Sequence, residues 1–217
     1  MKRSHLAAFI GVPIALLLLT AQPLVAASPA QAHTSGNRHA ATSPAAAKVR
    51  FGAKLTTNTQ PSNAGPAHVC SPQDPAAHSC TWVMNKSYNR TNGEAAPKDG
   101  VIAKIRVIAA VSGHFRLQLV KEKSATSRAK AVRNGPVLHY QGQPDNAVNY
   151  VIETFSVNVT VHKGERLAAK GNALSILRCD NGSPNVLQFE PPLVVGDSFR
   201  TADANDGCFL LIEAQYK

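Results

Sequence analysis

The sequence lacks the short motifs that mark several common hydrolases and redox proteins. It contains no G-x-S-x-G nucleophile motif and no H-E-x-x-H zinc motif. It also has no C-x-x-C pair, which argues against a thioredoxin-like site and against a zinc ribbon. Aromatic residues make up only 6% of the chain, which is few for a carbohydrate-stacking platform. We therefore predict no catalytic residue, no cofactor and no metal ion.

Two features keep a hydrolase open as an alternative function. The S-x-x-K motif occurs at Ser127–Lys130, but the partner motifs of penicillin-binding proteins, S-D-N and K-T-G, are missing. Glu153 begins an apolar strand pattern and is the carboxylate we consider for cleavage of wall polysaccharide or peptide. A glycosidase would need a second carboxylate beside it. Glu213 lies on the polar side of the last predicted strand, so we expect it to face solvent.

Residues 1–32 have the organisation of a secretion signal. Lys2 and Arg3 precede an apolar run that is shorter than the roughly 20 residues of a membrane-spanning helix. Small residues follow, with candidate cleavage sites after Ala27 and after Ala32. Cleavage would leave no membrane span and would lower the net charge from +10 to +8. We expect an extracellular protein.

The rest of the chain divides into a linker and one domain. Residues 33–47 carry almost no large apolar side chain, and such a segment cannot offset its own ordering entropy. We expect a disordered linker there and a single folded domain over 48–217. The oligomeric state is not predicted.

The four cysteines predict disulfides, because an even number in a secreted chain is typical of disulfide bonding. Four cysteines allow three connectivities. We favour Cys70–Cys80 and Cys179–Cys208, since each pair closes a local loop rich in Pro, Gly, Asn and Asp.

Alternation of apolar and polar residues predicts β-strands throughout. The odd positions of Val101–Val111 are all apolar, and so are Phe115, Leu117 and Leu119. Ser112 and Gly113 stand between these two runs, which favours a β-hairpin. The run from Phe155 to Val161 alternates in the same way. About nine such strands without a helical stripe indicate an all-β, two-layer antiparallel β-sandwich, with a jelly-roll or Greek-key connection expected.

Four short patterns resemble a group of secreted actinobacterial proteins that are generally single β-sandwich domains. They are C-T-W at 80–82, A-P-K-D-G-V-I at 96–102, F-R-L-Q-L at 115–119 and the strand and turn at 154–167. Ile105 stands where that group has Trp or a similar aromatic residue, and Glu165 replaces Asp. The resemblance implies fold and secretion; it implies no reaction.

The basic segment after the second run is the candidate anion-binding site. It contains one acid, Glu122, and few strand-forming residues, so we expect a projecting loop whose charges repel one another. The cations are Lys121, Lys123, Arg128, Lys130 and Arg133. The expected partner is an anionic or carbohydrate surface such as cell-wall polymer, bound without catalysis. Nucleic acid is not expected as a partner, and a structural coat protein is a further alternative.

Two further sets of residues are candidates for ligand contact. Trp82 and Tyr140 could stack on sugar rings, with packing near Cys80 as the alternative for Trp82. Asp203 and Asp206 carry oxygen ligands of the kind that calcium prefers. The segment lacks the rest of an EF-hand loop, and Asx turns before Gly207 are the alternative interpretation.

Overall fold

A computed structural model describes residues 48–61, 68–70, 79–89, 92–123, 126–143, 149–179 and 185–217. The predicted signal at 1–32 and the predicted linker at 33–47 lie outside the described residues.

The described residues form antiparallel strands and no helix. In chain order the strands are β1 (Arg50–Gly52), β2 (His68–Val69), β3 (Cys80–Met84), β4 (Gly100–Val107), β5 (Gly113–Lys123), β6 (Arg128–Tyr140), β7 (Glu153–Val161), β8 (Arg166–Gly171), β9 (Ala173–Leu174), β10 (Leu177–Cys179), β11 (Val186–Phe189), β12 (Arg200–Thr201), β13 (Ala204–Asp206), β14 (Cys208–Leu210) and β15 (Ile212–Tyr216). The prediction of an all-β chain is confirmed.

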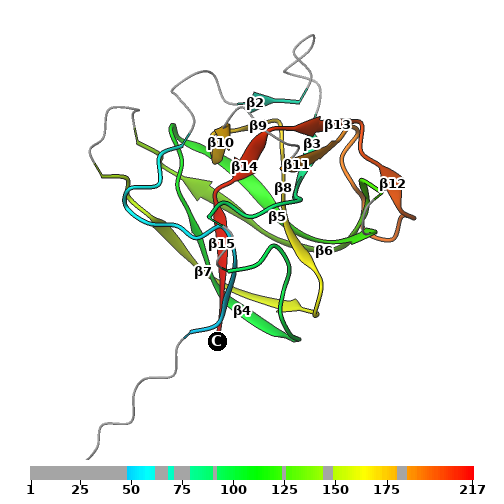
Figure 1. Cartoon of the computed structure of the whole chain (residues 1–217), viewed down its shortest axis with the longest axis horizontal. Helices are drawn as coiled ribbons and strands as arrows, with labels where there is room; N and C mark the ends of the chain where they lie inside the picture. Colours follow the sequence, from blue (N-terminus) through cyan, green and yellow to red (C-terminus); the bar gives the residue numbers. More distant parts are fainter. Residues whose placement is uncertain are drawn as a thin grey trace, which may run out of the picture. The chain divides into compact units, whose positions relative to one another are not determined.

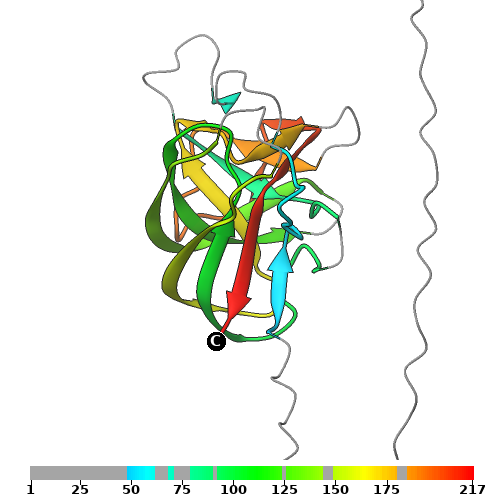
Figure 2. The same cartoon turned by 90° about the vertical axis from the view of Figure 1, so that its left-hand side faces the viewer.

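Two main sheets enclose the larger hydrophobic core. One has the order β1-β15-β4-β7 and the other β12-β6-β5-β8-β3-β11-β13, with the pairs β10-β14 and β2-β9 beside them (Figure 1). Figure 2 shows β1 and β15 side by side in the first sheet. Phe51 and Ile105 from this sheet, and Trp82 and Phe115 from the other, are buried in a common core. This is the predicted antiparallel β-sandwich; its jelly-roll or Greek-key connection stays a prediction.

The seven-stranded sheet also buries part of its outer face. This explains why every residue of β3 is buried. A second cluster there contains Val83, Val120, Phe189 and Leu193. Leu193 belongs to the segment between β11 and β12, which crosses the sheet. Burial on both faces removes the alternation of apolar and polar residues that a half-exposed strand would show.

The predicted hairpin of residues 99–121 is wrong. β4 pairs with β15 and β7, whereas β5 pairs with β6 and β8 in the other sheet. The connection between them is buried at Ile108, Ala109 and Ala110, and Ala110 N donates to Ser175 O at 3.0 Å. Ser112 and Gly113 therefore end a crossing between the layers rather than a tight turn.

A bulge changes which residues of β4 face the core. The register with β7 shifts between Ile102 and Lys104, so that Ile102 and Ile105 are both fully buried. The expected odd-numbered apolar face is therefore correct within β4 only at Ile105 and Val107, because a bulge moves the side chains that follow it to the other face. After β4 the alternation ends, since Ile108 and Ala110 are buried and Val111 is exposed. The alternation predicted for β7 is confirmed, since its even-numbered residues from Thr154 to Thr160 are exposed.

Glu213 is fully buried, which contradicts the expectation that it faces solvent. It lies opposite Arg106 on the neighbouring strand, and the two side chains form an ion pair. Arg50 Nη1 lies 3.3 Å from Glu213 Oε1, and Asn92 Nδ2 donates to Oε2 at 3.0 Å. One carboxylate thus joins β1, β4, β15 and the segment that precedes β4.

We expect Glu213→Gln to lower the free energy of unfolding by about 3–5 kcal/mol, because it leaves the largely buried Arg106 without its counter-charge. Urea denaturation measures the change. Asp99→Asn is the control, since the ion pair between Asp99 and His162 is exposed and its loss should change stability far less. Equal, small effects of both substitutions would contradict a stabilising role of Glu213.

Candidate anion-binding face

The basic segment is part of a long β-hairpin, so the prediction of a projecting loop is wrong. Lys121 and Lys123 lie in β5, and Arg128, Lys130 and Arg133 lie in β6. The turn is short: Thr126 N donates to Lys123 O at 3.2 Å, and Ser127 has a φ of 49°. Lysine and alanine have low strand propensity, but Ala129 and Ala131 are buried in the second core. Tertiary burial therefore decides the local structure.

Four cations share one face at the end of this hairpin. Lys121 is directly opposite Lys130, and Lys123 is directly opposite Arg128. Opposed residues and residues two apart point to the same side of a strand pair. We call Lys121, Lys123, Arg128 and Lys130 the cationic face. Like charges directly opposite each other destabilise a sheet unless another charge compensates them.

The cationic face is the continuation of the core-lining side of β5. Phe115, Leu117 and Leu119 alternate into the larger core and are fully buried. The next two residues on this side, Lys121 and Lys123, are exposed. The strand therefore extends beyond the residues that the core covers, and its side chains change from apolar to cationic where the cover ends.

The single acid of the segment points away from the cationic face. Glu122 alternates with Lys121 and Lys123, and its carboxylate lies 2.7 Å from Arg166 Nε. Burial raises the pKa of Glu122, while the positive charge of Arg166 lowers it and Glu94 adds to the rise. Glu122 is thus paired with another cation and leaves the four cations of the cationic face without an acid of their own segment.

Phe199 borders the cationic face and fixes two of its cations. Lys130 Nζ lies 5.0 Å from the centre of the Phe199 ring, and Arg128 Nη2 donates to Phe199 O at 2.8 Å. Arg128 Nε is buried and has no hydrogen-bond partner within the described residues. Arg128 and Lys130 are therefore held in place, whereas Lys121 and Lys123 extend into solvent.

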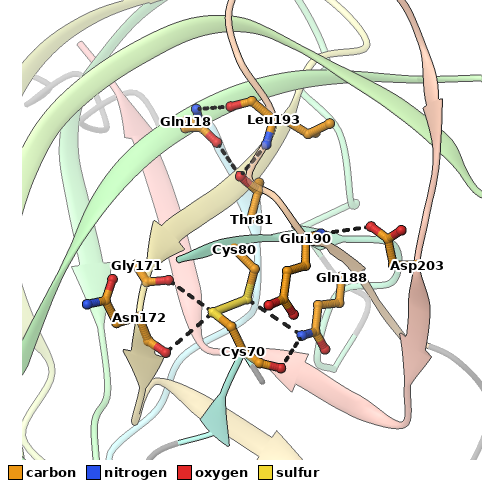
Figure 3. Close-up of a disulfide and its surroundings, with 10 residues drawn as sticks. All are labelled: Cys70, Cys80, Thr81, Gln118, Gly171, Asn172, Gln188, Glu190, Leu193 and Asp203. Carbon is orange, nitrogen blue, oxygen red and sulfur yellow. Dashed lines mark hydrogen bonds between the residues drawn. A yellow bond between two sulfur atoms is a disulfide. The ribbon is translucent and has the colours of Figure 1, made fainter. Parts of the chain in front are cut away.

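A polar network positions the segment that carries Phe199. On the outer face of the sheet, Thr81 Oγ1 donates to Gln118 Oε1 at 2.8 Å and accepts from Leu193 N at 3.1 Å (Figure 3). Gln118 Nε2 donates to Leu193 O at 3.2 Å. Glu190 N donates to Asp203 Oδ2 at 2.7 Å near the ends of the same segment. These side chains carried no recognisable sequence signal, because their partners are remote in the chain.

One acid, Asp99, interacts electrostatically with Lys121 of the cationic face. The pKa of Asp99 is lowered mainly by a hydrogen bond from Lys163 N, at 2.6 Å, and further by His162 and Lys121. Its carboxylate is exposed and lies 3.6 Å from His162 Nδ1. Asp99 already interacts with other groups, so it offsets the charge of the cationic face only in part.

Arg133 does not belong to the cationic face. Its Nη1 donates to Thr160 O at 2.7 Å and to Glu165 Oε2 at 3.1 Å. Glu165 is 1% exposed and also accepts a hydrogen bond from His162 N at 2.9 Å. Arg133 thus compensates a buried carboxylate in the connection from β7 to β8.

The two candidate sugar-stacking residues are buried, so neither ring is accessible to a sugar. Trp82 is 1% exposed and Tyr140 is 2% exposed, and both belong to the larger core. The Tyr140 hydroxyl accepts a hydrogen bond from Ser175 N at 3.3 Å. Trp82 lies two residues after a disulfide cysteine in the fully buried strand β3. Sequence composition identified these rings but could not show on which side of the sheet they lie.

The predicted disulfides Cys70–Cys80 and Cys179–Cys208 are both present. Within the described residues, one group of three side chains has the spacing of metal ligands: Cys179, Asp206 and Cys208. Both of its sulfur atoms are in a disulfide, so they offer no thiolate.

Both aspartates that were considered for calcium, Asp203 and Asp206, accept backbone hydrogen bonds, and Asp203 also forms an ion pair. Asp203 Oδ2 accepts from Glu190 N and lies 3.2 Å from Arg200 Nη2. Asp206 Oδ1 accepts from Cys208 N at 3.1 Å, two residues on. This is the Asx-turn interpretation at Asp206.

Glu153 lines a shallow hollow but lacks a partner carboxylate there. Two adjoining hollows of about 260 Å³ each share Gln141, Gly142 and Gln143, and Glu153 is the only carboxylate among the residues that line them. Both of its oxygens accept backbone hydrogen bonds at 2.9 Å, from Gln141 N and Gly142 N. The carboxylate orders this loop, and the paired carboxylates of a glycosidase are not found among these lining residues. Ser127 and Lys130 of the S-x-x-K motif lie at a hairpin turn and not at a helix start.

No protein-family model, curated protein or solved structure matches the chain. The resemblance to secreted actinobacterial proteins therefore stays a prediction. Among the residues described above, no helix has the length and apolar character needed to cross a membrane.

Replacement of Arg133 should separate its structural role from the role of the cationic face. We expect Arg133→Gln to lower the free energy of unfolding by about 1–3 kcal/mol, because Glu165 stays buried without its guanidinium partner. Lys123→Gln removes the same charge from an exposed position and should change stability by less than about 0.5 kcal/mol. Thermal unfolding of the two variants side by side measures the difference, and an unchanged midpoint for Arg133→Gln would show that the pair does not stabilise the fold.

Proposed function

We propose that the protein is secreted and binds a polyanionic polymer outside the cell, such as a cell-wall polymer, through the cationic face. The role is binding and not catalysis. The observation that carries the proposal is the direct opposition of four cations, in two cross-strand pairs, with the nearby acid Glu122 turned to the other side.

The two disulfides support the extracellular part of the proposal. Disulfides persist in oxidising compartments and are rare in the cytosol. The charged n-region and apolar run within residues 1–32 support the same location. The net charge, +10 for the full chain and +8 after the expected cleavage, favours anionic partners of any kind and speeds their encounter.

The geometry of the cationic face favours a polymer over a single small anion. Side chains two residues apart on a strand are separated by about 6.6 Å along it, and opposed pairs by about 5 Å. Four charges therefore form a two-by-two array that matches several anionic groups in succession. The exposed Lys121 and Lys123 can follow a flexible chain, while Arg128 and Lys130 are fixed beside Phe199. Such binding should weaken steeply as salt rises, because it releases counterions.

Neutralising the three lysines of the cationic face tests the proposal. Lys121→Gln, Lys123→Gln and Lys130→Gln combined should abolish salt-sensitive co-sedimentation with purified cell walls. With long-chain polyphosphate as a defined polyanion, the slope of log affinity against log salt should fall by about 2. Thermal stability should change by no more than about 1 kcal/mol, the size of an exposed cation–π contact.

A second triple variant controls for net charge. Lys48, Lys54 and Lys217 are exposed and lie outside the β5–β6 hairpin, so their replacement by Gln removes the same charge elsewhere. We expect this variant to bind cell walls nearly as the unaltered protein does. Equal weakening by both triples would show that net charge alone drives binding and would refute a dedicated face.

A further inference from the structure

A pair of histidines lies on the β5–β6 hairpin, at the end away from the cationic face. His114 in β5 is directly opposite His139 in β6. The two rings are stacked, with centres 5.3 Å apart and planes inclined by 27°. Their neighbours Phe115 and Leu138 point into the larger core. Because side chains alternate, the two imidazoles lie on the outer side of the sheet, where both are exposed.

The ring nitrogens of this pair are available to a ligand. Within the described residues, neither imidazole has a hydrogen bond or an ion pair, and each ring stacks on the other. By contrast, His162 lies beside the carboxylate of Asp99. Two unengaged imidazoles held at opposed positions of paired strands are pre-positioned by the backbone, which favours joint binding of one ion over separate weak contacts.

We propose that His114 and His139 form a two-imidazole site for a transition-metal ion of the Cu²⁺, Ni²⁺ or Zn²⁺ class. Opposed Cβ atoms lie about 4.5–5.5 Å apart, and an imidazole nitrogen binds zinc at about 2.0–2.1 Å. Side-chain rotation alone brings one nitrogen from each ring to a shared ion. Two protein ligands leave the other coordination positions open to water or to a ligand from solution. Cu²⁺ binds tightest of these ions in sites of this type.

The surrounding charges select against hard cations. Arg116 follows His114 on the same side of β5, and Lys170 lies opposite Arg116 on β8. The Arg116 guanidinium donates to Gly135 O at 3.2 Å and so is directed along β6. These positive charges disfavour an ion held by electrostatics alone. In the part of the chain that the structure describes, no carboxylate joins the two imidazoles in a group of three potential ligands, as Mg²⁺ or Ca²⁺ would need. Binding at this pair must therefore come from coordination by imidazole nitrogen.

Zinc titration of the untagged protein, followed by NMR of the histidine rings, tests the site. Zn²⁺ should shift the ring signals of His114 and His139 together with one-to-one saturation, and Mg²⁺ should shift neither. Calorimetry with Cu²⁺ should give a tighter site with the same stoichiometry.

Variants show whether the two rings act as one site. His114→Gln and His139→Gln should each weaken Zn²⁺ binding by at least about tenfold, since loss even of partners beyond the direct ligands costs 10–100-fold. The effect of the double variant should differ from the sum of the two single effects, as expected for two ligands that bind one ion together. His162→Gln is the matched control and should bind as the unaltered protein does.

The chain has eight histidines, so Zn²⁺ could also bind weakly at histidines other than His114 and His139. Zn²⁺ binding that persists at full affinity in the double variant would overturn the proposal. Saturation of the unaltered protein without joint movement of the His114 and His139 signals would overturn it as well. The NMR result does not depend on the variants, so a folding defect in one of them would not protect the proposal.

Discussion

The two-residue alternation of side chains along β5 links both cores of the protein to its candidate site. On one side, Phe115, Leu117 and Leu119 enter the core between the two sheets, and the lysines that follow emerge from it. On the other side, Gln118 anchors the crossing segment, Val120 enters the second core, and Glu122 pairs with Arg166. A shift of one residue in register would bury the lysines and expose the leucines. The position of the cationic face is thus fixed by the same pairing that forms the core.

The buried carboxylates have partners of opposite charge, whereas the cationic face largely lacks them. Glu213 and Glu165 are almost completely buried, and each has an arginine partner that offsets the cost of burial. The four cations of the cationic face have no equivalent carboxylate within the described residues; Asp99 contributes only a small share at one corner. Neutralised charges inside and uncompensated cations outside are what a protein that attracts an external polyanion requires.

Sequence patterns predicted which side of a strand is buried better than they predicted which strands pair with one another. The all-β fold, both disulfides and the alternation of β7 followed from local patterns. The sequence did not show that β4 and β5 belong to different layers, because alternation gives a strand one buried face without saying which strand lies beside it. The bulge after Ile102 carried no glycine or proline to mark it. Glu213 was misplaced because its cations Arg50 and Arg106 and its hydrogen-bond donor Asn92 are remote in the chain. Composition selected five cations for the proposed site, but Arg133 pairs with Glu165 instead. The array of the other four depends on the Lys121–Lys130 register, which only tertiary pairing defines.

We propose that a polyanion contacts the end of the β5–β6 hairpin, and NMR of the lysine side chains tests this contact residue by residue. The Nζ groups are observed during titration with polyphosphate at low salt. Binding at the cationic face should shift the signals of Lys121, Lys123 and Lys130 first and saturate them together, while those of Lys48, Lys54 and Lys217 should move little. Uniform shifts over all lysines, or shifts centred on another part of the protein, would show that the cationic face is not the binding site.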